Sequence, residues 1–189
     1  MLGWAGMYGG YTAAMFEIRL ATLEDAELIG QQRRQMFLDA GQPDDAVMAA
    51  MEEAFVPWVR MKIVEDRYIG FLASEDGVVV GGAGLWLMEF PPHFLDPAPL
   101  RAYLLNFYTA AEFRGRGLAK TLLAKCVEEA RLRGCEVVTL HASKFGKPIY
   151  EKNGFRQTNE MMLLFNPRKG DKTVSAADET VSSEAQAAR

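Results

Sequence analysis

The feature that most constrains this chain is the stretch LLNFYTAAEFRGRGLAKTLLAKCVEEARLRG, residues 104–134. It begins as an apolar, β-rich run, passes through a loop with two glycines, and continues with apolar residues at helical spacing. A helix that starts directly after such a loop presents unpaired backbone amides and the positive end of its dipole. The stretch therefore predicts an anion-binding junction between a strand and a helix.

Two arginines alternate with two glycines in this loop, as Arg114, Gly115, Arg116 and Gly117. The glycines have no Cβ atom to block a ligand that approaches the main chain, and the arginines add positive charge. A pyrophosphate fits that combination. The loop matches neither the Walker pattern nor the fingerprint Gly-x-Gly-x-x-Gly. Taken alone, the tetrapeptide would also fit an ordinary tight turn or an RNA-binding fragment.

Hydrophobic periodicity gives the order of elements along the rest of the chain. The expected elements are a strand over 16–22, helices over 22–38 and from Asp44 through Trp58, strands over 68–74, 78–88 and 101–109, a helix over 117–133, a strand over 136–142, a helix over 148–152 and an extended run over 155–165. The order β-α-α-β-β-β-α-β-α-β places the chain in the α/β (α+β) class.

Cap and breaker residues set the boundaries of the first two helices. Thr22 stands three residues before Asp25, which is typical of a capping box. Asp44 is expected to cap the second helix, because an aspartate side chain can accept from the free amides of the first turn. Pro57 is expected to kink or split that helix, because proline has no amide proton to donate.

Turn residues and composition divide the chain further. Asp-Gly at 76–77, between two apolar β-rich runs, predicts a hairpin, and the prolines of 91–99 predict a surface loop. Residues 1–14 carry no charge and show no clear periodicity, so we expect a loosely ordered extension. We expect the folded domain over 15–166 and a solvated tail over 167–189, which has almost no large apolar side chains.

Composition narrows the classes of function. The 189 residues carry a formal charge of −4, which disfavours general nucleic-acid binding. No apolar run approaches the roughly 20 residues that span a bilayer, and the opening stretch lacks the basic segment of a signal peptide. Two cysteines, Cys126 and Cys135, and two histidines, His93 and His141, match no metal or disulfide pattern. We therefore expect a cytoplasmic protein with no nucleic-acid, membrane or metal partner.

Two motifs carry a resemblance to a known family. The run Arg114-Gly115-Arg116-Gly117-Leu118-Ala119 resembles the pattern Gln/Arg-x-x-Gly-x-Gly/Ala of the GNAT superfamily of N-acetyltransferases, in the strand, loop and helix setting that the family requires. IYEKNGF at 149–155 resembles the segment LYEKxGF that closes the acetyl-CoA site in that superfamily. The stretch from Thr139 to Met161 is similar to a bacterial group whose substrates are mostly unassigned. The resemblance covers about residues 16–165, with diagnostic residues over 104–161.

The resemblance implies a mixed, mostly antiparallel central sheet flanked by helices, and an acetyl-CoA-dependent N-acetyltransferase without a metal. A neutral primary amine, on a small molecule or a peptide, would attack the thioester directly in a ternary complex. The positions that the resemblance assigns to acetyl-CoA are Phe107, Tyr108, Thr109, Arg114, Gly115, Arg116, Gly117, Leu118, Ala119, Lys120 and Ser143. The family often has Asn where this chain has Ser143, whose shorter side chain puts that contact in doubt.

The same resemblance assigns the catalytic roles. Tyr150 matches the family's tyrosine that protonates the leaving sulfur, and a phenol with a pKa of about 10 is protonated at neutral pH. Its other interpretation is a packed aromatic residue with a surface partner. The base is Glu89, Glu160 or a chain of water molecules. His141 is expected to be a hydrogen-bonded structural histidine.

Other interpretations stay open. A noncatalytic acyl-CoA-binding module or sensor would keep the phosphate loop without turnover, and an RNA-binding protein would use RGRG alone. The family's folds commonly dimerise, and the sequence leaves a homodimer open. Six apolar residues are either core or the wall of an acceptor pocket, with core favoured: Met48, Met51, Trp58, Met88, Phe90 and Phe94.

Overall fold

The computed structural model of the chain describes residues 16–94 and 96–162. The chain forms two units, Met1–Phe155 and Arg156–Arg189, and all the helices and strands of the described residues belong to the first. The expected extension over 1–14 and the expected tail over 167–189 lie outside the described residues. None of the described helices is long and apolar enough to cross a membrane.

Five strands form one sheet in the order β1-β2-β3-β4-β5. Neighbouring strands are antiparallel except for β4 and β5, which are parallel. The strands are β1 (Glu17–Leu20), β2 (Tyr68–Glu75), β3 (Val78–Glu89), β4 (Leu100–Thr109) and β5 (Val138–Leu140). The helices are α1 (Ala26–Asp39), α2 (Ala46–Val64), α3 (Leu118–Leu132) and α4 (Lys147–Lys152), with single turns η1 (Leu23–Asp25) and η2 (Ala111–Phe113). The mixed, mostly antiparallel sheet confirms the expected fold class.

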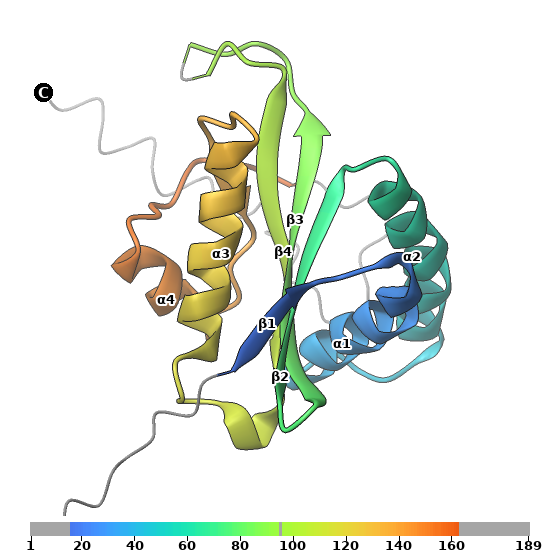
Figure 1. The fold of residues 1–189 in the computed structure, drawn as a ribbon. Helices are drawn as coiled ribbons and strands as arrows, with labels where there is room; N and C mark the ends of the chain where they lie inside the picture. Colours follow the sequence, from blue (N-terminus) through green and yellow to red (C-terminus); the bar gives the residue numbers. More distant parts are fainter. Residues whose placement is uncertain (1–15, 95, 163–189) are drawn as a thin grey trace, which may run out of the picture. The chain divides into compact units, whose positions relative to one another are not determined.

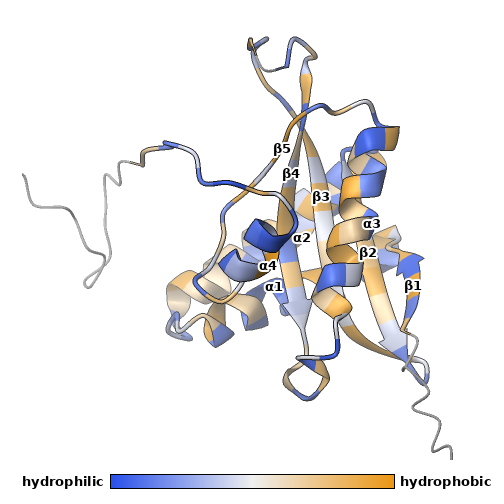
Figure 2. Ribbon diagram, turned by 90° about the vertical axis from the view of Figure 1, so that its left-hand side faces the viewer, coloured by the Kyte–Doolittle hydropathy of each residue, from blue (hydrophilic) through white to orange (hydrophobic). Residues whose placement is uncertain are grey.

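The helices lie in two layers, with α1 and α2 on one face of the sheet and α3 and α4 on the other (Figure 1). A large buried cluster lies between the sheet and α3, and includes Leu85, Leu104, Leu118 and Leu122. A smaller cluster joins β2 to α1 and α2. Hydrophobic colour runs along the strands between these layers in Figure 2. The central strands β2, β3 and β4 are therefore buried from both sides, which holds them in a fixed register.

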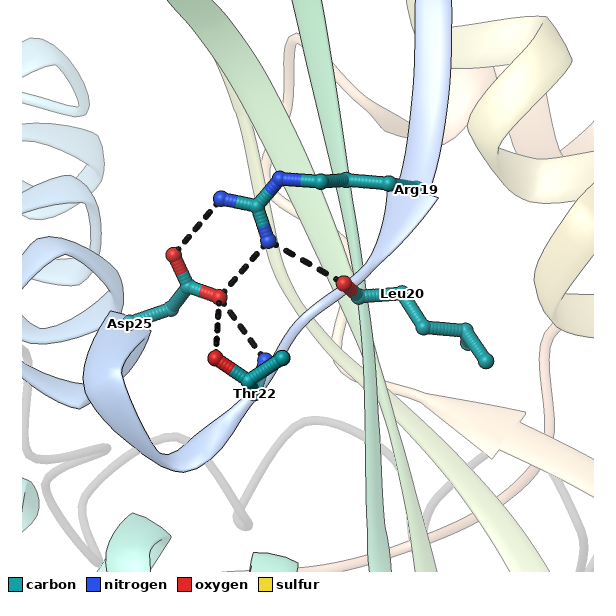
Figure 3. Close-up of polar contacts among 4 residues, drawn as sticks. All are labelled: Arg19, Leu20, Thr22 and Asp25. Atoms are coloured by element: carbon teal, nitrogen blue, oxygen red, sulfur yellow. Dashed lines mark hydrogen bonds and ion pairs between the residues drawn. The ribbon is translucent and has the colours of Figure 1, made fainter.

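The entry into the first helix follows the expected capping box. The backbone N–H of Thr22 donates to the Asp25 carboxylate at 2.7 Å, and Arg19 holds both oxygens of that carboxylate at 2.7 Å (Figure 3). The hydrogen bonds from Arg19 lower the pKa of Asp25 to about 2. Arg19 thus ties β1 to the start of η1 and α1.

The second helix corrects one expectation and refines another. Asp45, not Asp44, is its N-cap, because the Asp45 carboxylate accepts from the amides of Val47 and Met48 at 3.0 Å. Asp44 instead forms an ion pair with Arg34. Pro57 lies inside α2 without splitting it, because the helix is continuous from residue 46 to 64. The packing of α2 against β2 and α1 outweighs one missing hydrogen bond.

Three further expectations can be compared with the structure, and one of them is confirmed. The hairpin between β2 and β3 is confirmed, with left-handed φ values of 51° at Asp76 and 77° at Gly77. The strand expected over 155–165 does not form over 155–162, and residues 163–165 lie outside the described part. The strand expected over 136–142 is shorter, because β5 pairs with β4 only at Val138–Leu140.

Candidate functional site

The site is organised around an irregularity in the middle of β4. Across the β3–β4 pair, Gly82 lies opposite Tyr108, and Gly84 lies opposite Leu105. Two steps along β3 therefore face three steps along β4, so β4 carries one extra residue, a β-bulge. Asn106, inside this bulge, has a φ of 57°, a left-handed conformation that is uncommon for a residue other than glycine.

Buried hydrogen bonds hold Asn106 in this conformation. Asn106 is buried, with 3% of its surface exposed. Its Oδ1 accepts a hydrogen bond from Nη1 of Arg33 at 2.8 Å, and its Nδ2 donates one to the Tyr68 hydroxyl at 3.0 Å. Gly84 makes room for this arrangement, because a Cβ atom there would lie 2.3 Å from the Tyr68 hydroxyl oxygen. Side chains of α1 and β2 therefore fix the bulge of β4.

Beyond the bulge, β4 continues without β5 beside it. The β4–β5 pairing covers Ala102–Leu104 against Val138–Leu140, whereas β4 runs on to Thr109. Over 105–109, no other strand of the described residues pairs with the edge of β4 that faces β5. An open strand edge offers backbone donors and acceptors to an extended ligand with amide groups. The expected residues Phe107, Tyr108 and Thr109 lie on this edge.

The loop after β4 leads into α3 through two left-handed glycines. Gly115 has a φ of 77° and Gly117 a φ of 86°, and a Cβ atom built at either would have no atom within 4 Å. The backbone is therefore open to a ligand at both positions. α3 then starts at Leu118, whose side chain is 1% exposed and anchors the helix in the core. The first-turn amides have no carbonyl one turn earlier within the helix, which suits a diphosphate.

The structure places the two loop arginines in ion pairs. Arg114 pairs with Asp39 at the end of α1, and its Nε donates to the Thr109 carbonyl at 3.0 Å. Arg116 pairs with Glu75 at the end of β2. Both guanidinium groups are thus neutralised and brace the loop against the sheet and α1. Contact of Arg114 and Arg116 with an anion, through side chain or backbone amide, stays a prediction.

The remaining residues of the predicted acetyl-CoA site at this end of the sheet are Lys120, Ala119 and Ser143. Lys120 is exposed, and its amide already donates to the Gly117 carbonyl at 3.0 Å. Ala119 lies in the first turn of α3. Ser143 is exposed, and its Oγ accepts from the Gly146 amide at 3.1 Å, which leaves its hydroxyl proton for another acceptor. Their binding roles stay predictions.

Tyr150 lies beside the bulge on the opposite side from Arg33. Its ring meets the Phe107 ring edge-on, with centroids 5.8 Å apart, and packs against Phe155 at 5.8 Å. Burial raises the pKa of Tyr150 to about 12, so the phenol keeps its proton at neutral pH. Adjacent residues of β4 thus contact opposite layers, Asn106 on the side of α1 and Phe107 on the side of α4.

The structure does not bring Glu89 to this place. Glu89 pairs with Leu100 at the first residue of β4, whereas the bulge and the glycine loop lie toward the other end of that strand. Its side chain is 83% exposed and lies 3.8 Å from Arg67. It lines a hollow of about 570 Å³ between the end of α2 and β3. Glu160 belongs to the separate unit that begins at Arg156, and its role stays a prediction.

The histidines are apart from each other. The hydrogen bond expected for His141 is present, between its Nδ1 and the hydroxyl of Tyr103. His93 lies in the proline-rich loop, where its backbone pairs with Asp96. Within the described residues, no group of three or more His, Cys, Asp or Glu side chains is placed to share a metal ion.

The candidate pocket residues lie in different parts of the fold. Met48 is buried, with 3% of its surface exposed, and Met51 and Trp58 pack in the cluster that joins α1 and α2 to β2. Phe94 is 88% exposed in the proline-rich loop, and the ring of Phe90 lies 3.4 Å below the guanidinium of Arg101. For the first three, core packing is therefore the interpretation that the structure supports.

Sequence reasoning missed the residues that shape the site. Asn106, Arg33 and Tyr68 hold the bulge, and Asp39 and Glu75 hold the loop. One signal was present in the sequence: the glycines of GGAG at 81–84 weaken a central strand unless another group must approach it closely. The polar Asn106 inside an apolar strand was a second signal.

The sequence and the fold match known proteins. The profile of the Acetyltransferase (GNAT) family matches residues 20–155. Glucosamine 6-phosphate N-acetyltransferase of Trypanosoma brucei brucei is 32% identical over 94 residues, 50% of this chain and 62% of that protein. This match thus spans less than two thirds of the relative. Aminoglycoside N(6')-acetyltransferase type 1 of Salmonella typhimurium is 27% identical over 139 residues, 72% of this chain and 88% of that protein. Among solved structures, a predicted acetyltransferase of Clostridium acetobutylicum with acetyl-CoA is 28% identical, with a TM-score of 0.73 over 79% of this chain and 96% of that one.

Proposed function

The chain belongs to the acetyltransferase (GNAT) family, and from that membership we propose that it transfers the acetyl group of acetyl-CoA to a primary amine. The observation that carries the proposal is the combination of a bulged, open edge of β4 with a glycine loop at the start of α3. Similarity to a structure with acetyl-CoA supports the choice of donor.

The residues fit the donor in two places. The open edge of β4 over 105–109 suits the amide groups of the pantetheine arm, as a further strand would. The backbone from Gly115 to Ala119 suits the diphosphate, because both glycines leave space and the helix dipole favours negative charge. Ion pairs of Arg114 and Arg116 hold this loop in place before a ligand arrives. The thioester, at the end of the pantetheine arm away from the diphosphate, would then lie near the bulge.

The bound donor supplies a thioester carbonyl that an amine can attack. The amine nitrogen forms a bond to the carbonyl carbon, the carbon–sulfur bond breaks, and the sulfur leaves with the electron pair of that bond. Tyr150 then gives the sulfur a proton, which its raised pKa keeps in place at neutral pH. The phenol is regenerated by the proton that the amine loses to water. We assign that proton to water rather than to Glu89, because Glu89 lies at the far end of β3, and Glu160 stays the other candidate base.

Two measurements on the full chain test the proposal. Calorimetry should detect binding of acetyl-CoA, and a panel of primary amines should include at least one that releases free coenzyme A thiol. The names of the relatives from Trypanosoma and Salmonella place amino sugars first in that panel. If acetyl-CoA raises the melting temperature while no amine releases thiol, the noncatalytic acyl-CoA-binding module becomes the better interpretation. Absence of acetyl-CoA binding to the folded chain would refute both.

A further inference from the structure

The guanidinium of Arg33 is a partly buried positive charge that no acidic side chain of the described residues neutralises. No carboxylate lies within 4.0 Å of it among the described residues, and its Nε is buried without a hydrogen-bond partner there. The next residue is different, because Arg34 forms ion pairs with Asp44 and Glu52. A buried charge without a counter-charge is unfavourable, since it has lost water and gained no opposite charge in return.

The groups around Arg33 offset only part of the cost of burying its charge. Its Nη1 donates to Asn106 at 2.8 Å, and its guanidinium lies 4.9 Å from the centre of the Phe37 ring and 4.7 Å from that of Phe55. Aromatic faces attract a cation but do not neutralise it. Loss of water on burial lowers the pKa of Arg33, and the groups that act against this are Tyr68 and Tyr103. An apolar residue in this place would avoid the cost of burying a charge.

Arg33 and Tyr150, the proposed acid, contact neighbouring residues of β4 from opposite faces of the sheet. Arg33 contacts the bulge through Asn106 from the layer of α1, while Tyr150 contacts the next residue of β4, Phe107, from the layer of α4. The rings of Tyr150 and Phe107 occupy the α4 side of β4 at this point, so the acceptor amine of the proposed reaction approaches from the other side. That side is the layer of α1, where Arg33 lies. Arg33 thus contacts the bulge from the side on which the proposed reaction places the acceptor.

We propose that Arg33 binds an anionic group, a carboxylate or a phosphate, on the acceptor, and that the acceptor is an amine carrying an acidic group. This inference rests on the proposed function and names its substrate class. A guanidinium binds oxygen anions through charge-assisted hydrogen bonds, and this one lies between the rings of Phe37 and Phe55, at 4.9 and 4.7 Å from their centres. The same charge repels acceptors with several positive groups, so a polycationic aminoglycoside is a poor acceptor.

Pairs of acceptors that differ only in one acidic group test the assignment. Glucosamine and glucosamine 6-phosphate form the phosphate arm, and an α-amino acid and its amide form the carboxylate arm. In at least one arm, the anionic member should have a kcat/KM about 10-fold higher or more, because charge-assisted hydrogen bonds are the strong ones. The preferred arm identifies the anion. Equal kcat/KM values within both pairs, or preference for the uncharged members, would overturn the proposal.

Variants then test whether Arg33 is the cause. Arg33→Gln keeps a donor for Asn106 but removes the charge, so the ratio within the preferred pair should fall to about 1, mainly through a higher KM of the anionic member. Asn106→Asp places a carboxylate beside Arg33 and should also abolish the ratio. Arg101→Met is the matched control: Arg101 also has a buried, unpartnered Nε among the described residues and stacks on an aromatic ring, but lies near the first residue of β4. It should leave the ratio unchanged.

A ratio is insensitive to a general loss of active protein, so a partly unfolded variant remains informative. Equilibrium binding of the same pairs in the presence of coenzyme A gives a readout without turnover. Preference for an anionic member there, without any acetylation, would support the assignment of Arg33 while the proposed enzyme activity fails. A ratio that survives in Arg33→Gln, or no binding of any member, would refute the role of Arg33.

Discussion

Replacement of Asn106 tests how the bulge of β4 is held. Alanine removes the hydrogen bond from the charged Arg33, worth about 1.5–3 kcal/mol, and the bond to Tyr68, worth about 0.5–1.5 kcal/mol. Asparagine and alanine both carry a Cβ atom and both have to adopt a φ of 57°, so this conformation adds little to the difference between them. The free energy of unfolding should therefore fall by about 2–4.5 kcal/mol, a large part of what a typical domain has.

Glycine at the same position separates the two causes. Asn106→Gly loses the same hydrogen bonds but adopts the left-handed conformation without strain, so it should be more stable than Asn106→Ala by about 1–2 kcal/mol. Urea unfolding followed by tryptophan fluorescence measures both free energies, because Trp58 contacts Tyr68 in the same cluster. Equal destabilisation by alanine and glycine would refute the role of the backbone conformation. Loss of less than about 0.5 kcal/mol in both would refute the role of the hydrogen bonds.

Three further predictions follow from the same structure. Tyr150→Phe should lower kcat about 100-fold or more and leave the Kd of acetyl-CoA unchanged; an unchanged kcat would exclude the proton-donor role. Gly117→Ala should weaken acetyl-CoA binding in calorimetry and lower the free energy of unfolding by about 1–2 kcal/mol, because its φ is 86°, whereas Ala119→Ser in the same turn should do neither to that extent. The pKa of Asp25 is lowered from 3.8 to about 2 in the folded chain, so its contribution to stability is present above pH 4 and is lost as pH falls toward 2. Asp25→Asn should flatten acid unfolding in that range, and an unchanged pH profile would argue against the ion pair with Arg19.

Features that depend on neighbours in sequence could be predicted. Three such features are the Asp-Gly hairpin, the capping box of Thr22 and Asp25, and the glycine loop before α3. Each depends on residues that lie within a few positions of one another. Their physical causes are backbone conformation and short-range hydrogen bonds, which the residue types themselves express. The one-residue error at the cap of α2 is of the same kind, because Asp44 and Asp45 are both suitable and packing selects between them.

What the sequence alone determined is thus the order of elements as far as α4, the glycine loop before α3 and, through its two motifs, the family. The tertiary structure alone decided which side chains meet at the bulge and the loop. Arg33 is 73 positions from Asn106, Tyr68 is 38 positions from Asn106, and Asp39 is 75 positions from Arg114. It also decided that Glu89 lies near the wrong end of β4, because only the pairing register fixes how far apart two residues lie along a sheet. Contacts of such separation follow from the packing of α1 and the sheet, which no local pattern of residues encodes.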